Sequence, residues 1–140
     1  MNAIEQNNIK MLKILLQDKR VDLASGNNEA IVLASITCNV EAVQLLVESK
    51  RVDPSVRHNT ALAQAAENGC TEVVRILLQD ARVNPNDENL ISNAASRGYT
   101  EIVKLILTHP RISKQAKTIA YENAFKKGHL GILRLVRSLT

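Results

Sequence analysis

The sequence of 140 residues is poor in aromatic side chains: it has two Tyr, one Phe and no Trp, together 2% of the chain. Apolar residues nevertheless make up 45% of it, so a core has to be built from Leu, Ile, Val and Ala. Small and branched aliphatic side chains suit thin, regular layers of closely packed helices. Few large aromatic anchors are left for a binding hot spot.

Long hydrophobic runs and the common catalytic motifs are also missing. No stretch approaches the roughly 18 apolar residues of a membrane span, and the N-terminus has no secretory signal pattern. The sequence contains no GxGxxG, Walker, GxSxG or HExxH motif. The three histidines, His58, His109 and His129, are too far apart for the usual metal-ligand spacing. We therefore expect no membrane partner, no catalytic, cofactor or metal site, and no enzymatic activity.

Only two cysteines are present, Cys38 and Cys70, and they form no CxxC pair and no cluster with histidine. Such usage is typical of a reduced, intracellular protein, so we expect a cytoplasmic location. Cys70 without a nearby histidine is interpreted as a small residue in a turn rather than as a nucleophile.

The most informative positive feature is an internal repeat. The string ILLQD occurs at residues 14–18 and again at 76–80, a separation of 62 residues or twice 31. The segments 45–49, 101–107 and 131–137 continue the same register. Repeats of this length are units that bury their apolar faces only by stacking on neighbours. We predict one domain over residues 1–140, with a partial unit at 1–19 and full units at 20–50, 51–81, 82–110 and 111–140.

Each full unit is predicted to contain two short helices. In the third unit, Asn59 or Thr60 is expected to cap the first helix, and Gly69 to end it in the left-handed conformation. The second helix is expected from about Thr71 to Gln79. Helices of about nine residues are marginal alone and need neighbours to bury them.

The joints between units and the partial first unit also follow the register. Pro54 and Pro85 predict projecting turns in the joints. One apolar residue in each joint is expected to be buried beneath the helix pair: Val21, Val52, Val83 and Ile112. Residues 3–7 align with 65–69, so the chain is expected to begin late in a first helix.

Residues 60–69, TALAQAAENG, and 72–78, EVVRILL, closely resemble the ankyrin repeat, whose pattern is T-P-L-H-x-A-A-x-x-G-H-x-E-V-V-x-x-L-L. Shared positions recur in the later units: Ala94, Ala95, Gly98, Thr100, Glu101, Ile102, Val103, Gly128, His129 and Leu130. The resemblance implies an all-α ankyrin-repeat solenoid of stacked antiparallel helix pairs, with short projecting loops and little or no strand. The units have 29 to 31 residues instead of about 33. Ala61 and Ala63 replace the Pro and His of T-P-L-H, which puts hydrogen bonds between adjacent loops in doubt.

Two positions in this register are expected to be weak. Cys38 stands where other units have glycine, and a non-glycine residue in the left-handed region costs roughly 1–2 kcal/mol. A Cys38–Cys70 disulfide is conceivable but disfavoured, because neighbouring helices stack about 8–10 Å apart and a bridge needs Cα atoms within about 7 Å. Gly131 lies inside a helix, where it costs roughly 1 kcal/mol relative to alanine, and predicts fraying there.

Charge is uneven along the chain. Residues 1–110 hold 11 basic and 13 acidic residues, whereas residues 111–140 hold seven basic residues and one acidic residue. The basic end is interpreted as a solubilising terminal cap. The alternative is an electropositive edge for nucleic acid or an acidic partner. No aromatic residues are expected to interleave with these basic residues and stack on bases, which argues against nucleic acid.

The resemblance implies a non-enzymatic module that binds a protein partner through its concave helix face and loop tips. The partner is unidentified, and we expect the protein itself to be a monomer. A purely architectural role, as a segment of a longer array, is a further alternative. The residues expected to bind a partner are those that differ between units at the helix ends and loop tips: Ile36, Thr37, Val56, Arg57, His58, Glu67, Asn68, Asp87, Glu88, Ser96, Arg97, Lys126 and Lys127.

Overall fold

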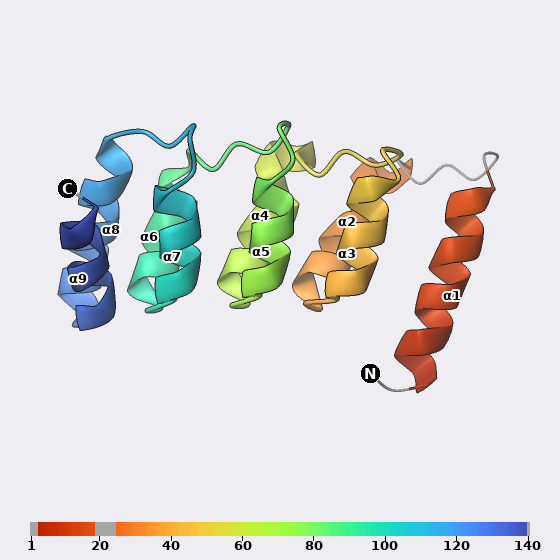
Figure 1. The fold of residues 1–140 in the computed structure, drawn as a ribbon, viewed down its shortest axis with the longest axis horizontal. Helices are drawn as coiled ribbons and strands as arrows, with labels where there is room; N and C mark the ends of the chain where they lie inside the picture. The colour runs from red at the N-terminus through yellow and green to blue at the C-terminus, as the bar shows by residue number, and fades with distance from the viewer. Residues whose placement is uncertain (1–2, 19–24, 140) are drawn as a thin grey trace.

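The computed structural model of the protein describes residues 3–18 and 25–139. Within this part of the chain the structure contains nine α-helices and no strand (Figure 1). In chain order they are α1 (Ala3–Gln17), α2 (Ser25–Ile36), α3 (Val40–Glu48), α4 (Val56–Glu67), α5 (Thr71–Leu78), α6 (Glu88–Ser96), α7 (Thr100–Leu107), α8 (Gln115–Lys127) and α9 (Leu130–Ser138).

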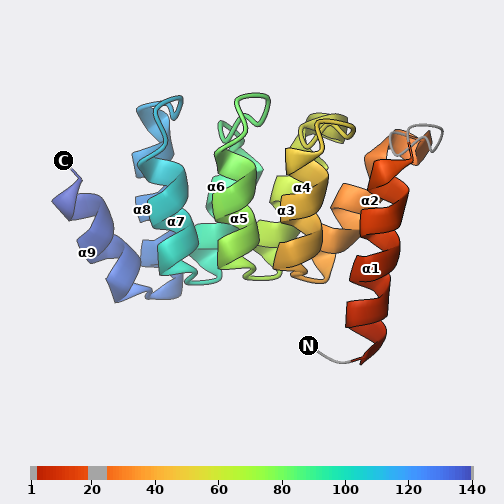
Figure 2. The ribbon, with the colours of Figure 1, turned by 45° about the vertical axis from the view of Figure 1, so that its right-hand side comes forward.

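From α2 onward the helices form antiparallel pairs that stack side by side in a row (Figure 1). The first helices of the pairs pack on one another in one layer and are called the inner helices: α2, α4, α6 and α8. The second helices form the other layer and are called the outer helices: α3, α5, α7 and α9. Helix α1 continues the outer layer by packing on α3. Long loops project along one edge of the row, and tight turns join each pair at the opposite edge (Figure 2). The expected all-α solenoid of helix pairs is confirmed.

Aliphatic and small side chains fill the space between the layers. Leu62, Leu77 and Ile102 are completely buried, as expected for a core without aromatic anchors. Alanines line the contact between the inner helices α6 and α8, where helices can approach closely: Ala94, Ala95, Ala116, Ala120 and Ala124 are all buried.

Two of the three described apolar residues of the joints are buried as expected. Val52 and Val83 lie beneath their helix pairs and are almost inaccessible to solvent. Ile112 is half-buried, and Val21 lies outside the described residues.

The tight turns that end the inner helices have left-handed backbone, as predicted. Gly69, Gly98 and Gly128 have φ of 71°, 75° and 74°, and Cys38 adopts the same region with φ of 54°. Glycine suits this position because a Cβ is unfavourable there. Cys38 is therefore the one described turn of this row at which a side chain has to be accommodated.

The right-handed part of α4 begins at Thr60, as the sequence predicts, because residues 57–59 have left-handed φ values of 52° to 63°. The predicted capping hydrogen bond to the side chain of Asn59 or Thr60 is wrong, because both side chains have other partners. The Asn59 side chain instead accepts a hydrogen bond from the backbone N–H of Asn84 in the next loop, at 3.2 Å. Thr60 donates to the Arg57 carbonyl at 2.6 Å. Local sequence suggested a cap, but the neighbouring loop competes for the same side chain.

The expectation that the chain begins late in a first helix is also wrong. Helix α1 runs without interruption from Ala3 to Gln17, across the position that aligns with the turn at Gly69. Asn7 stands where that glycine stands in the third unit. Because Asn7 and Asn8 do not force a left-handed turn, the helix continues through them.

Adjacent loops are joined by hydrogen bonds from residues other than those of T-P-L-H. The arginine that opens each described joint donates to backbone carbonyls 28 to 36 residues earlier in the chain. Arg51 donates to Leu15 and Leu16, Arg82 to Val52, and Arg111 to Ala81 and Val83, at 2.8–3.2 Å.

Asn86 adds a second connection between loops. Its amide oxygen accepts from the Ser113 N–H at 2.7 Å, and its amide nitrogen donates to the Arg111 carbonyl. Carbonyls and N–H groups outside the helices are thus satisfied by neighbouring units.

The structure contradicts the prediction against a disulfide: Cys38 and Cys70 are bonded, with Cα atoms 5.3 Å apart. The spacing of helix axes was the wrong measure, because Cys38 lies in the turn after α2 and Cys70 in the turn before α5. These turns approach more closely than the helices do. The sequence separation of 32 residues is one more than the repeat, so Cys70 stands one position after Gly69, the residue that aligns with Cys38.

Candidate interaction surface

Four pairs of variable residues lie in a row at the C-terminal ends of the inner helices. Each pair ends or follows its helix because the left-handed turn comes directly after it. The pairs are Ile36 and Thr37 at α2, Glu67 and Asn68 at α4, Ser96 and Arg97 at α6, and Lys126 and Lys127 at α8. Glu67 and Ser96 are half-buried, and the other six are exposed. The structure therefore brings these predicted residues together as one row.

Some side chains of this row are already held by their own helix. Thr37 donates to the Leu33 carbonyl at 3.0 Å, and Asn68 donates to the Gln64 carbonyl at 2.8 Å. Both carbonyls also accept the backbone N–H of the same residue, at 3.1 Å, so each side chain adds a second hydrogen bond at its helix end. These side-chain hydrogen bonds also fix the orientation of both side chains at the surface.

The predicted loop-tip residues lie at the opposite, N-terminal ends of the inner helices. Arg57 and His58 are exposed in the left-handed segment of α4, Glu88 is exposed at the start of α6, and the Val56 side chain lies outside the described residues. Asp87 is a helix cap, since its carboxylate accepts from the N–H groups of Asn89 and Leu90 at 2.8 and 3.3 Å. Loop tips and helix-end pairs are thus two rows separated by the length of an inner helix.

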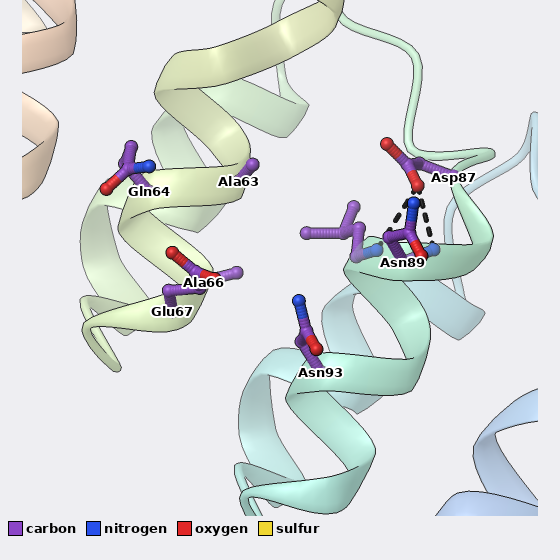
Figure 3. Close-up of a pocket in the computed structure, with 8 residues that line it drawn as sticks. Ala63, Gln64, Ala66, Glu67, Asp87, Asn89 and Asn93 are labelled. Atoms are coloured by element: carbon purple, nitrogen blue, oxygen red, sulfur yellow. Dashed lines mark hydrogen bonds between the residues drawn. The ribbon is translucent and has the colours of Figure 1, made fainter.

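A hollow of about 120 Å³ lies between these rows, at the contact of α4 with α6 (Figure 3). Gln64 and Glu67 border it from α4, and Asn89 and Asn93 border it from α6. Sequence reasoning missed Gln64, Asn89 and Asn93. A helical spacing of three or four residues back from each pair would have found Gln64 and Asn93, because such residues share a helix face.

The same spacing identifies Leu33 on α2, three residues before Ile36. Its side chain is 60% exposed, and that of Ile36 is 40% exposed. The row therefore changes along the array from apolar at α2, through acidic and amide groups at α4, to basic at α6 and α8.

Polar side chains join α6 to α8 beside this row. Ser92 and Ser96 donate to the amide oxygen of Asn123 at 3.0 and 3.4 Å, and the Asn123 amide nitrogen donates to the Ile119 carbonyl at 2.8 Å. The bond to Ser96 holds one predicted contact residue in place at the helix junction.

Aromatic side chains do lie among the basic residues of α8, contrary to expectation. The rings of Tyr121 and Phe125 stack with centroids 6.3 Å apart, and Phe125 is 67% exposed directly before Lys126 and Lys127. The low aromatic content of the whole chain hid the fact that two of its three aromatics are on one helix. The basic end thus combines cationic and aromatic surface.

The histidines in the turns and joints have structural partners. The ring of His129 packs against Gly98, and its Nε2 lies 2.7 Å from the Ser96 carbonyl. His109 accepts from the Arg111 N–H through Nδ1, at 3.2 Å, so that Nε2 carries the proton and donates to the Leu78 carbonyl, at 3.1 Å. Among the described residues, no group of three or more His, Cys, Asp or Glu side chains could hold a metal ion.

Two carboxylates in the joints have a lowered pKa. The Asp80 pKa is lowered chiefly by the side-chain hydrogen bond from Arg82, whose guanidinium approaches to 2.8 Å. The Asp53 pKa is lowered chiefly by the hydrogen bonds from the hydroxyl and N–H of Ser55. Both groups shape the joints and lie apart from the row of pairs.

Comparison with known proteins agrees with this architecture. Residues 1–89 match the family described as ankyrin repeats (3 copies). No curated protein matches the chain. No helix among the described residues is long and apolar enough to cross a membrane. With most of its length matched to that family and its helix pairs stacked as the family requires, the chain belongs to the ankyrin repeat family.

Proposed function

We propose that the protein is a non-enzymatic module that binds a protein partner across the inner helices and loop tips, in the cytoplasm and as a monomer. Ankyrin repeats are in general protein–protein interaction modules and typically lack enzymatic activity. The observation that carries the proposal for this chain is the row of variable pairs. Its side chains differ between units, whereas the glycine turns and buried alanines next to them recur.

The chemical gradient of the row supports one orientation of a bound partner. An apolar segment of the partner fits Leu33 and Ile36, and an acidic segment fits Arg97, Lys126 and Lys127. Complementary charge fixes register and accelerates association more than it raises affinity. The hollow between α4 and α6, bordered by amide groups, offers hydrogen bonds to a polar side chain between these two ends.

The test is affinity capture followed by mass spectrometry with the full chain and two quadruple variants. The surface variant carries Asn68→Ala, Arg97→Ala, Lys126→Ala and Lys127→Ala. The control carries Lys10→Ala, Gln79→Ala, Lys104→Ala and Arg134→Ala, all exposed positions in or just after outer helices. Each set removes three positive charges and one amide.

A partner that is retained by the control and lost by the surface variant supports the proposal, provided that both variants melt cooperatively. Equal capture by both variants rules out the row of pairs as the binding surface. Equal loss from both would indicate attraction by net charge alone.

A second candidate is binding of nucleic acid or another acidic partner by the basic end, supported by the exposed Phe125 directly before Lys126 and Lys127. Aromatic faces stack on bases, and lysines contact phosphates. Binding of a fluorescent single-stranded oligonucleotide should then fall steeply with salt and should be lost with Phe125→Ala. A Phe125→Ala variant that binds as well as the original protein would exclude stacking. An architectural role within a longer array remains the third candidate, favoured if neither test finds a ligand.

A further inference from the structure

We infer that Cys38 and Cys70 form a reversible thiol–disulfide site that controls how firmly the α2/α3 pair is joined to the α4/α5 pair. Cys38 lies in the turn between α2 and α3, and Cys70 immediately precedes α5. Their bond crosses from one pair to the next, with Cα atoms 5.3 Å apart. The inference concerns this junction and does not depend on the identity of a partner.

The corresponding positions at the next two junctions show what the disulfide replaces. There a glycine in the turn is covered by a ring from the following unit. A Cβ on Gly69 would lie 3.3 Å from the Tyr99 ring, and a Cβ on Gly98 would lie 2.7 Å from the His129 ring. At the Cys38 junction a small side chain replaces the ring, and a covalent bond takes over the contact.

Reduction therefore has a local effect that the other junctions cannot show. Reduction removes the covalent link between the turns after α2 and before α5, while the packing of α2 on α4 and of α3 on α5 remains. Cys38 then retains a left-handed backbone without the bond that holds it there.

The two cysteines differ in exposure. Cys38 is exposed and borders two surface hollows of about 630 and 320 Å³. Cys70 also borders the smaller hollow but is only 5% exposed. A small thiol therefore reaches Cys38 more readily than Cys70.

The chemistry is thiol–disulfide exchange with a small thiol or its disulfide as co-reactant. In reduction, a small thiolate attacks the Cys38 sulfur, the Cys38–Cys70 bond breaks, and Cys70 leaves as a thiolate that takes up a proton. A second small thiolate attacks the mixed disulfide at its small-molecule sulfur, releasing the small-molecule disulfide and leaving Cys38 as a thiol. The small thiols supply both electrons, and the reverse sequence restores the bond.

The reduced state has partners for the released thiol. The Cys70 sulfur lies 3.5 Å from the Ser35 carbonyl, so a Cys70 thiol can donate to that oxygen. Its place at the N-terminal end of α5 also favours the transient thiolate, because the helix dipole is positive there. Reduction can thus occur without unfolding of the array.

The bond acts directly on two of the four variable pairs. Thr37 precedes Cys38 in the chain, and Asn68 is two residues before Cys70. Loosening this junction should make the α2 and α4 ends of the row mobile, while α6 to α9 keep their contacts.

The test measures the redox state and the local opening of the full chain in glutathione buffers of graded composition. Disulfide content is read from a gel shift after thiol alkylation, and amide hydrogen exchange is measured by mass spectrometry. We expect reversible reduction in folded protein and about tenfold faster exchange in residues 36–39 and 67–71, with unchanged rates in α6 to α9.

Cys38→Gly is the matched control, because it restores the glycine of the other units and leaves Cys70 alone. Its exchange should not respond to the buffer. The inference is overturned if the two thiols fail to pair in oxidising buffer, if the bond resists glutathione until the protein unfolds, or if both redox states exchange equally at the junction.

Discussion

At the scale of single residues, the glycines of the left-handed turns allow two effects of substitution to be measured apart. One is the cost of placing a Cβ on a left-handed backbone, and the other is the cost of a steric clash with a neighbouring side chain. Gly98 and Gly128 have nearly the same φ, but a Cβ on Gly98 would meet the His129 ring and a Cβ on Gly128 would meet nothing within 4 Å. Both alanine variants carry the left-handed penalty of about 1–2 kcal/mol. We predict that Gly98→Ala destabilises the protein by about 1 kcal/mol more than Gly128→Ala in urea denaturation, because the ring has to move away from Ser96.

His129→Ala provides the check on this explanation, because it removes the ring that the new Cβ would displace. Combined with His129→Ala, Gly98→Ala should cost no more than Gly128→Ala. If Gly98→Ala still cost more stability than Gly128→Ala in the His129→Ala background, the extra cost would not come from the His129 ring.

The lowered pKa of Asp80 in the joint predicts how the stability of the protein responds to acid. A pKa lowered in the folded state adds stability that is fully present above the ordinary value of 3.8 and is lost as the pH falls from there through the folded pKa. The Asp80 pKa is lowered mainly by its hydrogen bond with Arg82. Asp80→Asn should therefore lower the urea midpoint at pH 7 and flatten its fall below about pH 4. Glu122→Gln, an exposed carboxyl on α8, serves as the control; if it had the same effect, net charge would be responsible.

At the scale of helices, Gly131 is the second residue of α9 and lies in the first turn of that helix. The fraying predicted at Gly131 stays a prediction. A Cβ there would approach the Thr100 hydroxyl to 3.3 Å, which requires a shift of a few tenths of an ångström. Thr100 is only half-buried, so its side chain can shift away. The higher helix propensity of alanine should therefore outweigh the close contact.

We predict that Gly131→Ala slows amide exchange in α9 and stabilises the protein by up to about 1 kcal/mol. Hydrogen exchange of the original protein gives the reference, in which α9 should be less protected than α5 and α7. Equal protection of the three helices would show that stacking on α7 already suppresses fraying.

Sequence periodicity predicted the helices well where the signal is local. The turn at Gly69 and the start of α5 at Thr71 were found because glycine and apolar spacing act within one unit. The role of Asn59 was missed because its hydrogen-bond partner, Asn84, is 25 residues away. The continuity of α1 was missed because alignment to another unit replaced the helix preference of its own residues.

The candidate surface was predictable to the same extent. The pairs could be placed from the repeat, since each directly precedes a turn. The stacked rings of Tyr121 and Phe125 were predictable in principle, because residues four apart lie on one face of the same helix; they were missed because the aromatic content of the whole chain is low. The Cys38–Cys70 disulfide depends on how neighbouring units lie against one another, a distance that sequence spacing does not contain.

At the scale of the whole molecule, each helix pair is buried only by its neighbours, so position in the array sets the environment of a residue. The string ILLQD demonstrates this because it occurs twice with identical letters. Leu77 in α5 is completely buried between layers, whereas Leu15 in α1 is 36% exposed. In α5, the inner helix α4 of the same pair covers this face, and α1 has no such helix among the described residues.

We therefore predict that the same substitution has unequal effects at the two copies. Leu77→Ala should cost about 3 kcal/mol of unfolding free energy, because it leaves a cavity between packed layers. Leu15→Ala should cost about 1 kcal/mol, because part of its surface is already in water. Denaturant midpoints should be measured at two protein concentrations tenfold apart. Equal losses at the two sites would contradict the exposure of α1, and if the Leu15→Ala loss also shrank on dilution, a second molecule would be covering α1 in solution.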